Sequence, residues 1–183
     1  TLVFGIYLKA VPPTTPGGLS NFALFLFAAL IIWNGFSNIL NGSMSALFDA
    51  GGLMGKIYFP PECPAIANVF SSLLQVLTEI AVMAGVMLLL GNIGWSWIIM
   101  PLLVVELVFF ALGLGLMASL LNVFYRDIGY LVGILMQVLF YATPIVYALD
   151  DIPETIGGFP IKTVVEASPL TQLTLQARQS MYM

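Results

Sequence analysis

Long apolar stretches separated by short polar connections make up most of this chain. A helix needs about 20 predominantly apolar residues to cross the hydrocarbon core of a bilayer. We therefore predict membrane-spanning helices over residues 20–41, 65–90, 95–121 and 129–149. A shorter apolar stretch, residues 1–11, is interpreted as part of an earlier span.

The remaining residues, 152–183, are less apolar and are interrupted by Pro160 and Pro169. We expect short helices there, outside the membrane or folded back into it as re-entrant or gate helices. The chain begins within the short apolar stretch 1–11 and ends within the segment 152–183. We therefore expect about five of six spans, with truncation at both ends. Longer polar connections occur at residues 42–64 and around Arg126-Asp127.

Composition agrees with a membrane protein. Hydrophobic residues make up 60% of the chain, charged residues 8%, and the mean hydropathy is +1.03. A soluble domain carries about 25% charged residues. We predict an all-α, polytopic membrane protein, a single transmembrane helix bundle over residues 1–183. The net charge of −4 gives no indication of nucleic-acid binding.

Enzyme chemistry has no support in the sequence. There is no histidine and one cysteine, Cys63, so neither a Ser-His or Cys-His pair nor a Cys/His metal site is present in the sequence. No Gly-x-x-x-x-Gly-Lys-Ser/Thr phosphate loop occurs. We predict no catalytic residues, no metal site and no cofactor bound by this chain itself.

Polar residues inside the apolar stretches are candidates for function. Asn34, Asn38 and Asn41 recur at helical spacing, so they form one polar stripe that faces protein or a water-filled path. Glu79 lies in the middle of a span, where a charged side chain costs about 2.5–3.5 kcal/mol. Helix packing and an export path remain alternatives for both features.

Small residues predict close helix contacts. Ala111, Gly115 and Ser119 are spaced four apart and let another helix approach closely, and Gly129 and Gly133 repeat the pattern. Pro144 kinks or ends the helix that contains them, because proline has no amide donor.

Five short motifs follow one another along the chain. They are Trp33-x-x-Phe36-Ser37, Gly55-Lys56-Ile57-Tyr58-Phe59-Pro60-x-Glu62, Asn122-Val123-Phe124-Tyr125-Arg126-Asp127, Thr143-Pro144-Ile145-Val146-Tyr147 and Ser168-Pro169-Leu170-Thr171. With these motifs in this order, the chain from Pro16 to Gln176 resembles the permease subunit of a type 2 ABC exporter, of the branch that moves polysaccharides, O-antigen and teichoic acid.

The resemblance implies a membrane-spanning permease subunit of the bacterial cytoplasmic (inner) membrane, paired with a second copy as a homodimer. ATP and Mg would be bound by a separate ABC ATPase subunit, and a lipid-linked polymer would leave between the permeases. A coupling helix within residues 47–61 would dock on the ATPase. The residues implied in ATPase coupling are Lys56, Tyr58, Phe59, Pro60, Glu62, Arg126 and Asp127.

Span counting places the loops at Lys56 and Arg126 on one face, and the resemblance assigns that face to the cytoplasm, with Pro13 and Asp151 outside. A membrane-surface anchor is the alternative role for Arg126-Asp127.

For the substrate path we select four aromatic residues and one acid, and for the outer gate Pro144. The path residues are Trp33, Phe36, Glu79, Tyr141 and Tyr147. Packing and lipid contacts are the alternative for the aromatic residues, and a plain helix end is the alternative for Pro144. Alternative functions are export of a drug or small lipid by a related permease, an ATP-independent channel, and a membrane-embedded synthase.

Overall fold

A computed structural model describes residues 22–50, 52, 56, 60, 62–90, 95–125, 127–147, 149 and 161–182. The described residues form helices and their connections and contain no strand, which confirms the all-α prediction. The helices are α1 (Phe22–Asp49), α3 (Cys63–Leu89), the 3-10 turn η2 (Trp95–Ile99), α4 (Met100–Phe124), α5 (Ile128–Ala142), α6 (Ile161–Ala167) and α7 (Pro169–Tyr182).

Three helical segments are long and apolar enough to cross a membrane: Phe22–Ala46, Cys63–Leu89 and Trp95–Phe124. They occupy the predicted intervals 20–41, 65–90 and 95–121 with shifted ends, and α1 continues to Asp49. The apolar helix α5 has 15 residues, which corresponds to about 22 Å at 1.5 Å per residue. It occupies only the first part of the interval 129–149. Residues 1–11 lie outside the described residues.

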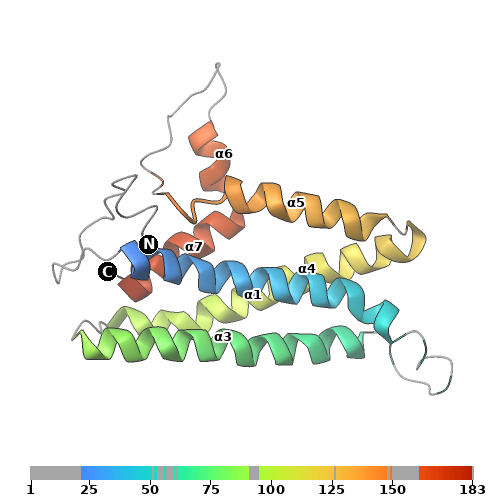
Figure 1. Ribbon diagram of the computed structural model, residues 1–183, viewed down its shortest axis with the longest axis horizontal. Helices are drawn as coiled ribbons and strands as arrows, with labels where there is room; N and C mark the ends of the chain where they lie inside the picture. Colours follow the sequence, from blue (N-terminus) through green and yellow to red (C-terminus); the bar gives the residue numbers. More distant parts are fainter. Residues whose placement is uncertain are drawn as a thin grey trace.

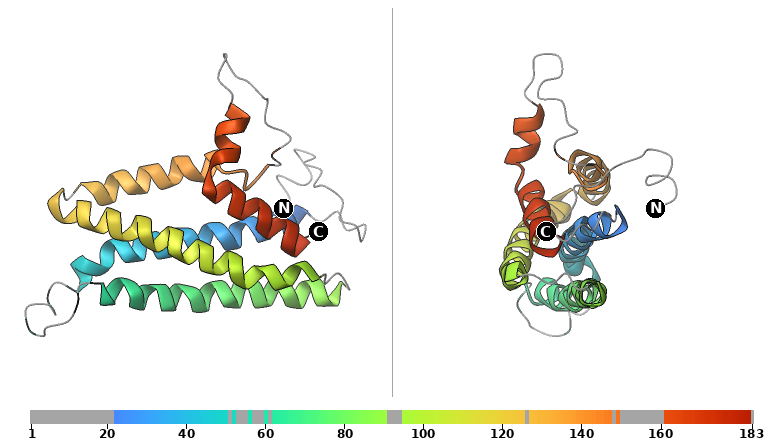
Figure 2. Two further views of the ribbon diagram at one scale, coloured as in Figure 1. Left: turned by 180° about the vertical axis from the view of Figure 1, so that it is seen from behind. Right: turned by 90° about the vertical axis from the view of Figure 1, so that its left-hand side faces the viewer.

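Helix α1 lies at the centre of the bundle. It packs against α3 on one side, against α4 along most of its length, and against α7 near its N-terminal end (Figures 1 and 2). Its side chains Ala28, Ile31, Ile32 and Ile39 are completely buried. The outer faces of α3, α4 and α5 instead carry many exposed large apolar side chains, as expected where helices face lipid.

The predicted small-residue face of α4 is confirmed. Ala111, Gly115 and Ser119 are all buried, and a Cβ added at Gly115 would lie 2.8 Å from the Cβ of Ser43 and 3.0 Å from the carbonyl oxygen of Leu40. Only glycine permits the backbones to come this close. Gly133 in α5 repeats this pattern but makes no such close helix contact. A Cβ added at Gly133 would meet no atom of another described segment within 4 Å.

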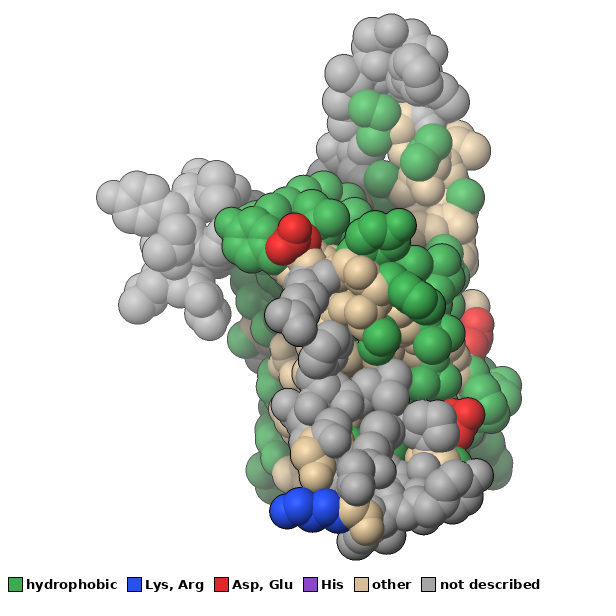
Figure 3. Space-filling view, turned by 90° about the vertical axis from the view of Figure 1, so that its right-hand side faces the viewer, with side chains coloured by type: hydrophobic (Ala, Val, Ile, Leu, Met, Phe, Trp, Pro, Cys, Tyr) green, Lys and Arg blue, Asp and Glu red, His purple; other side chains and the backbone are tan. Residues whose placement is uncertain are grey.

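The helix ends next to the two polar connections lie at one end of the bundle. Figure 1 shows the C-terminal ends of α1 and α4 and the N-terminal ends of α3 and α5 on the right. This arrangement agrees with one shared face for the loops at Lys56 and Arg126, although Arg126 itself lies outside the described residues. Figure 3 views this end, where the described charged side chains are few and separate.

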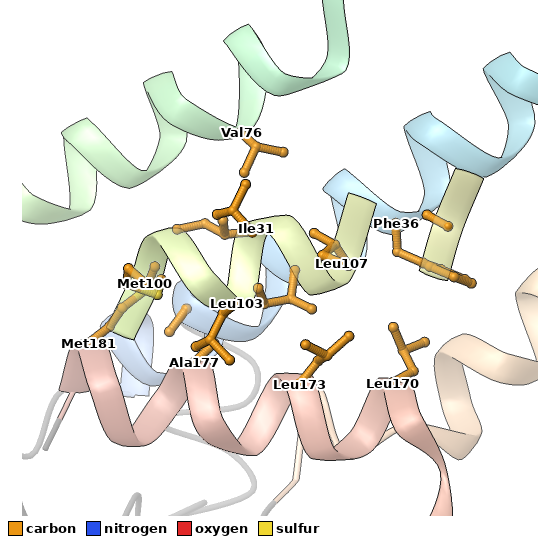
Figure 4. Close-up of a cluster of buried hydrophobic side chains, with 14 of the residues drawn as sticks. Ile31, Phe36, Val76, Met100, Leu103, Leu107, Leu170, Leu173, Ala177 and Met181 are labelled. Atoms are coloured by element: carbon orange, nitrogen blue, oxygen red, sulfur yellow. The ribbon is translucent and has the colours of Figure 1, made fainter. Parts of the chain in front are cut away.

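Helix α7 is part of the core and not a helix lying alone at the surface. Its apolar side chains Leu170, Leu173, Ala177 and Met181 recur at helical spacing and are buried. They point toward Met100, Leu103 and Leu107 of α4 and Ile31 of α1 (Figure 4). The shorter helix α6 projects away from the bundle (Figure 2).

Candidate functional site

The residues selected for a substrate path fall into two separate regions. The first is an aromatic cluster formed by Trp33, Phe36, Phe110, Phe140 and Tyr141, from α1, α4 and α5. Ring centroids lie 6.1 Å apart for Trp33 and Phe36, 5.1 Å for Trp33 and Phe140, 5.6 Å for Phe36 and Phe110, and 5.4 Å for Phe140 and Tyr141. Edge-on and offset ring contacts at these distances are favourable.

Members of the aromatic cluster differ in accessibility. Phe36 is only 1% exposed and stacks on Phe110, so its ring is enclosed by protein. Trp33 is half-buried, and Tyr141 is 69% exposed. Of the selected aromatic residues on α1 and α5, Trp33 and Tyr141 are therefore at least partly accessible, whereas Phe36 is not.

The chain bends directly after α5. Thr143 has an extended backbone, with ψ at 135°, because a residue that precedes proline avoids the helical region. Helix α5 thus ends at Ala142, and Pro144 lies beyond its end. Of the two predicted possibilities, a kink or a helix end, the structure shows a helix end. Pro144 and Ile145 are buried.

Side chains in the bend donate hydrogen bonds to carbonyl groups in the last turn of α5. The Thr143 hydroxyl donates at 2.8 Å to the Leu139 carbonyl, which also accepts the Thr143 amide at 2.9 Å. The Tyr147 hydroxyl lies 3.0 Å from the Tyr141 carbonyl and 3.3 Å from that of Ala142. Tyr147 therefore ties the bend back to the last residues of α5, next to the exposed Tyr141.

A buried arginine also fixes this bend. Arg178 of α7 is 5% exposed, and its guanidinium donates to the Ile145 carbonyl at 2.6 Å and lies 3.7 Å above the Phe25 ring. The Nε of Arg178 is buried without a partner among the described residues. Burial lowers the pKa of Arg178 to about 10, so the side chain stays protonated at neutral pH. In the sequence, Arg178 lies on the same helical face as Leu170, Thr174, Ala177 and Met181, which are buried. This spacing could have predicted that Arg178 is buried as well.

The second region is a polar groove between α1 and α3, with a volume of about 480 Å³. Its lining consists only of polar residues and one glycine: Asn38, Asn41, Gly42, Ser45, Asn68, Ser71, Ser72 and Gln75. Of the predicted asparagine stripe, Asn38 and Asn41 line the groove and Asn34 does not. Helix α3 supplies the other half of the lining.

Hydrogen bonds connect the groove to Glu79. Asn38 Nδ2 donates to Gln75 Oε1 at 3.2 Å, and Gln75 Nε2 donates to Glu79 Oε1 at 3.2 Å. The other carboxylate oxygen of Glu79 is buried without a partner among the described residues. Glu79 is therefore linked through Gln75 to the polar groove without lining it, and it is separate from the aromatic residues with which it was selected.

The residues selected for ATPase coupling are only partly described. Lys56, Pro60, Glu62 and Asp127 are all exposed, and the α1–α3 and α4–α5 connections that contain them share one end of the bundle (Figure 1). Tyr58, Phe59 and Arg126 lie outside the described residues.

Asn122, in the same motif as Asp127, has a structural role. Its Oδ1 accepts the Gly129 amide at 3.0 Å and so ties the end of α4 to the first turn of α5.

Comparisons with known proteins agree with this arrangement. The sequence model of the family described as "ABC-2 type transporter" matches residues 1–182. An "O-antigen export system permease protein RfbA" of Klebsiella pneumoniae is 29% identical over 164 residues, which is 88% of this chain and 61% of the relative. A protein of the same description from Myxococcus xanthus is 27% identical over 155 residues, 84% of this chain and 60% of the relative. The chain thus spans about three fifths of these curated relatives.

Proposed function

Because this chain belongs to the ABC-2 type transporter family, we propose that it is the membrane-spanning permease part of an ATP-driven exporter of a lipid-linked polysaccharide. The observation that carries the proposal is the family match along residues 1–182. The relatives described as O-antigen export permeases support a polymer of the O-antigen type. A teichoic-acid-type polymer is the nearest alternative.

The proposal includes a separate ABC ATPase that binds ATP and Mg. The sequence has no phosphate loop. Lys56, Glu62 and Asp127 are exposed, and their connections share one end of the bundle, where a partner can reach them together. We assign this end to the cytoplasmic side of the bacterial inner membrane and to ATPase coupling.

The proposal also includes a second permease copy, with the polymer leaving between the two copies. Trp33 and Tyr141 supply accessible aromatic faces on α1 and α5, and such rings combine an apolar face with a polar edge that suits a hydrated sugar. The bend at Pro144, held by Tyr147 and Arg178, lies at the far end of α5 from the coupling turn. We assign this bend to the outer gate.

The test is reconstitution of the full-length permease with its cognate ATPase in proteoliposomes loaded with fluorescently tagged lipid-linked glycan. We expect glycan translocation that requires both ATP and the ATPase. Glycan movement by the permease alone would indicate a channel and contradict the proposal. ATP-driven movement of small amphiphiles without glycan movement would favour the drug or lipid exporter.

A further inference from the structure

The polar groove extends into the predicted membrane region. Along α3 its lining runs from Asn68 to Gln75, seven residues and therefore about 10 Å at 1.5 Å per residue. That length is about a third of the roughly 30 Å hydrocarbon layer. Polar groups within the membrane face protein or a water-filled space and not lipid. The lining residues Ser45 and Asn68 lie near the C-terminal end of α1 and the N-terminal end of α3, which meet at the end of the bundle assigned to ATPase coupling (Figure 1).

The geometry of the groove depends on Gly42. A Cβ at Gly42 would overlap the Asn68 side chain, so glycine allows Asn68 to lie directly against α1. From there Asn68 donates to the Asn38 backbone carbonyl at 3.4 Å. The neighbouring Asn41 donates to the Ser37 carbonyl at 2.8 Å, and Ser45 donates to the Asn41 carbonyl.

These hydrogen bonds leave side-chain acceptors among the lining residues. Asn38, Asn41 and Asn68 each use the side-chain amide nitrogen as a donor to protein. Their side-chain oxygens have no partner among the described residues. Ser71 and Ser72 add hydroxyl groups to the same lining. These groups can accept hydrogen bonds from the O–H donors of a ligand.

We propose that the polar groove is a binding site for a neutral, hydroxyl-bearing group. No lining residue carries a charge, so the site lacks the cation that a phosphate requires and the carboxylate cluster typical of a metal site. Its volume of about 480 Å³ lies in the ordinary range of small-molecule sites. On the proposed function, the ligand is a sugar unit of the glycan before translocation; a glycolipid head group has the same chemistry.

A single-cysteine experiment tests the site in the full-length permease assembled with its ATPase in phosphatidylcholine nanodiscs. The variant is Cys63→Ser with Ser71→Cys, a nearly isosteric change that places a thiol in the groove. The rate of labelling by an impermeant maleimide is measured with a panel of neutral hexose and deoxyhexose oligosaccharides, with oligogalacturonates as the anionic control, and in nanodiscs that contain a glycosyl diacylglycerol. Native Cys63 is exposed at the start of the same helix and outside the groove, and provides the matched control.

We expect the thiol at position 71 to react and to be protected by neutral sugars but not by oligogalacturonates, while Cys63 stays unprotected. Protection by soluble oligosaccharides identifies the polymer as the source, and protection only by glycosyl diacylglycerol identifies the lipid head group. Asn38→Leu in the same background should raise the half-protecting concentration about three- to tenfold, the effect of one lost hydrogen bond. Gln137→Leu, on an exposed position of α5, should leave it unchanged.

Two results would overturn the proposal. A reactive thiol that no sugar or glycolipid protects would make the groove a water-filled space only. A thiol that reacts only after the complex is separated would show that a protein helix covers the groove. Since the labelling needs no ATP, its outcome is independent of the translocation assay, and failure of one does not imply failure of the other.

Discussion

Helix α1 takes part in two very different contacts, with α4 on one side and with α3 on the other. The α1–α4 contact is closely packed, and glycine with small and apolar side chains brings the backbones close together at Gly115. The α1–α3 contact has a similar apolar portion around Gly35 and Val76, but toward the connecting end it opens into the polar groove. In a membrane, where apolar burial alone provides little driving force, close packing holds helices together. At the groove, α1 and α3 are therefore less closely packed than around Gly35, and their polar side chains are accessible.

Phe36→Ala should produce the largest effect, because it removes a buried ring from the α1–α4 contact. Phe36 is 1% exposed, and replacing a buried Phe by Ala costs about 3–5 kcal/mol. Thermal unfolding of the full-length permease in detergent measures the loss, and Phe109→Ala, on a 72% exposed position of α4, is the control. Equal melting temperatures for both variants would show that Phe36 is not a packing residue.

Gly115→Leu should destabilise the same contact by overpacking. The new side chain meets the Ser43 Cβ and the Leu40 backbone, and a loss of about 1–3 kcal/mol is expected. Gly113→Leu is a matched control on the same helix, because a Cβ added at Gly113 would meet no atom of another described segment within 4 Å. If Gly113→Leu is as destabilising as Gly115→Leu, the close approach of α1 and α4 is not the cause.

Gln75→Leu should affect the α1–α3 contact much less. The variant breaks the hydrogen bond to Asn38 across the contact and the one to Glu79 within α3. Hydrogen bonds between helices in a membrane contribute about 0.6 kcal/mol on average. We expect a small change in melting temperature together with a clear loss of glycan translocation. A melting temperature reduced as far as in Phe36→Ala, with translocation retained per folded molecule, would assign the groove to stability instead.

Pro144→Ala should change stability little and tests the proposed outer gate. Tyr147 already donates to the Tyr141 and Ala142 carbonyls at the end of α5, and removal of a compatible proline costs about 0.4–1 kcal/mol through the unfolded chain. Without proline, Thr143 regains access to the helical region, so we expect α5 to lengthen and translocation to fall while insertion and ATPase association persist. Translocation at the wild-type rate would leave Pro144 as a helix end only.

Several features of the protein follow from local spacing along the chain. Hydropathy predicted the all-α membrane class, because a spanning helix needs a long uninterrupted apolar stretch. Span counting predicted one face for the loops at Lys56 and Arg126, and four-residue spacing identified the Ala111, Gly115 and Ser119 contact. The order of the five motifs indicated the family to which residues 1–182 match.

Which polar and aromatic residues share a site depends on how the helices pack. Glu79 and Trp33 were both predicted to line the substrate path, yet Glu79 is linked through Gln75 to Asn38 of the groove, while Trp33 packs on Phe140. Arg178 reaches the Ile145 carbonyl across 33 positions of sequence. Spacing along one helix fixes the face on which a side chain lies, but not the helix that this face meets. That choice depends on packing between distant segments, where small residues such as Gly42 and Gly115 decide how closely two helices can approach.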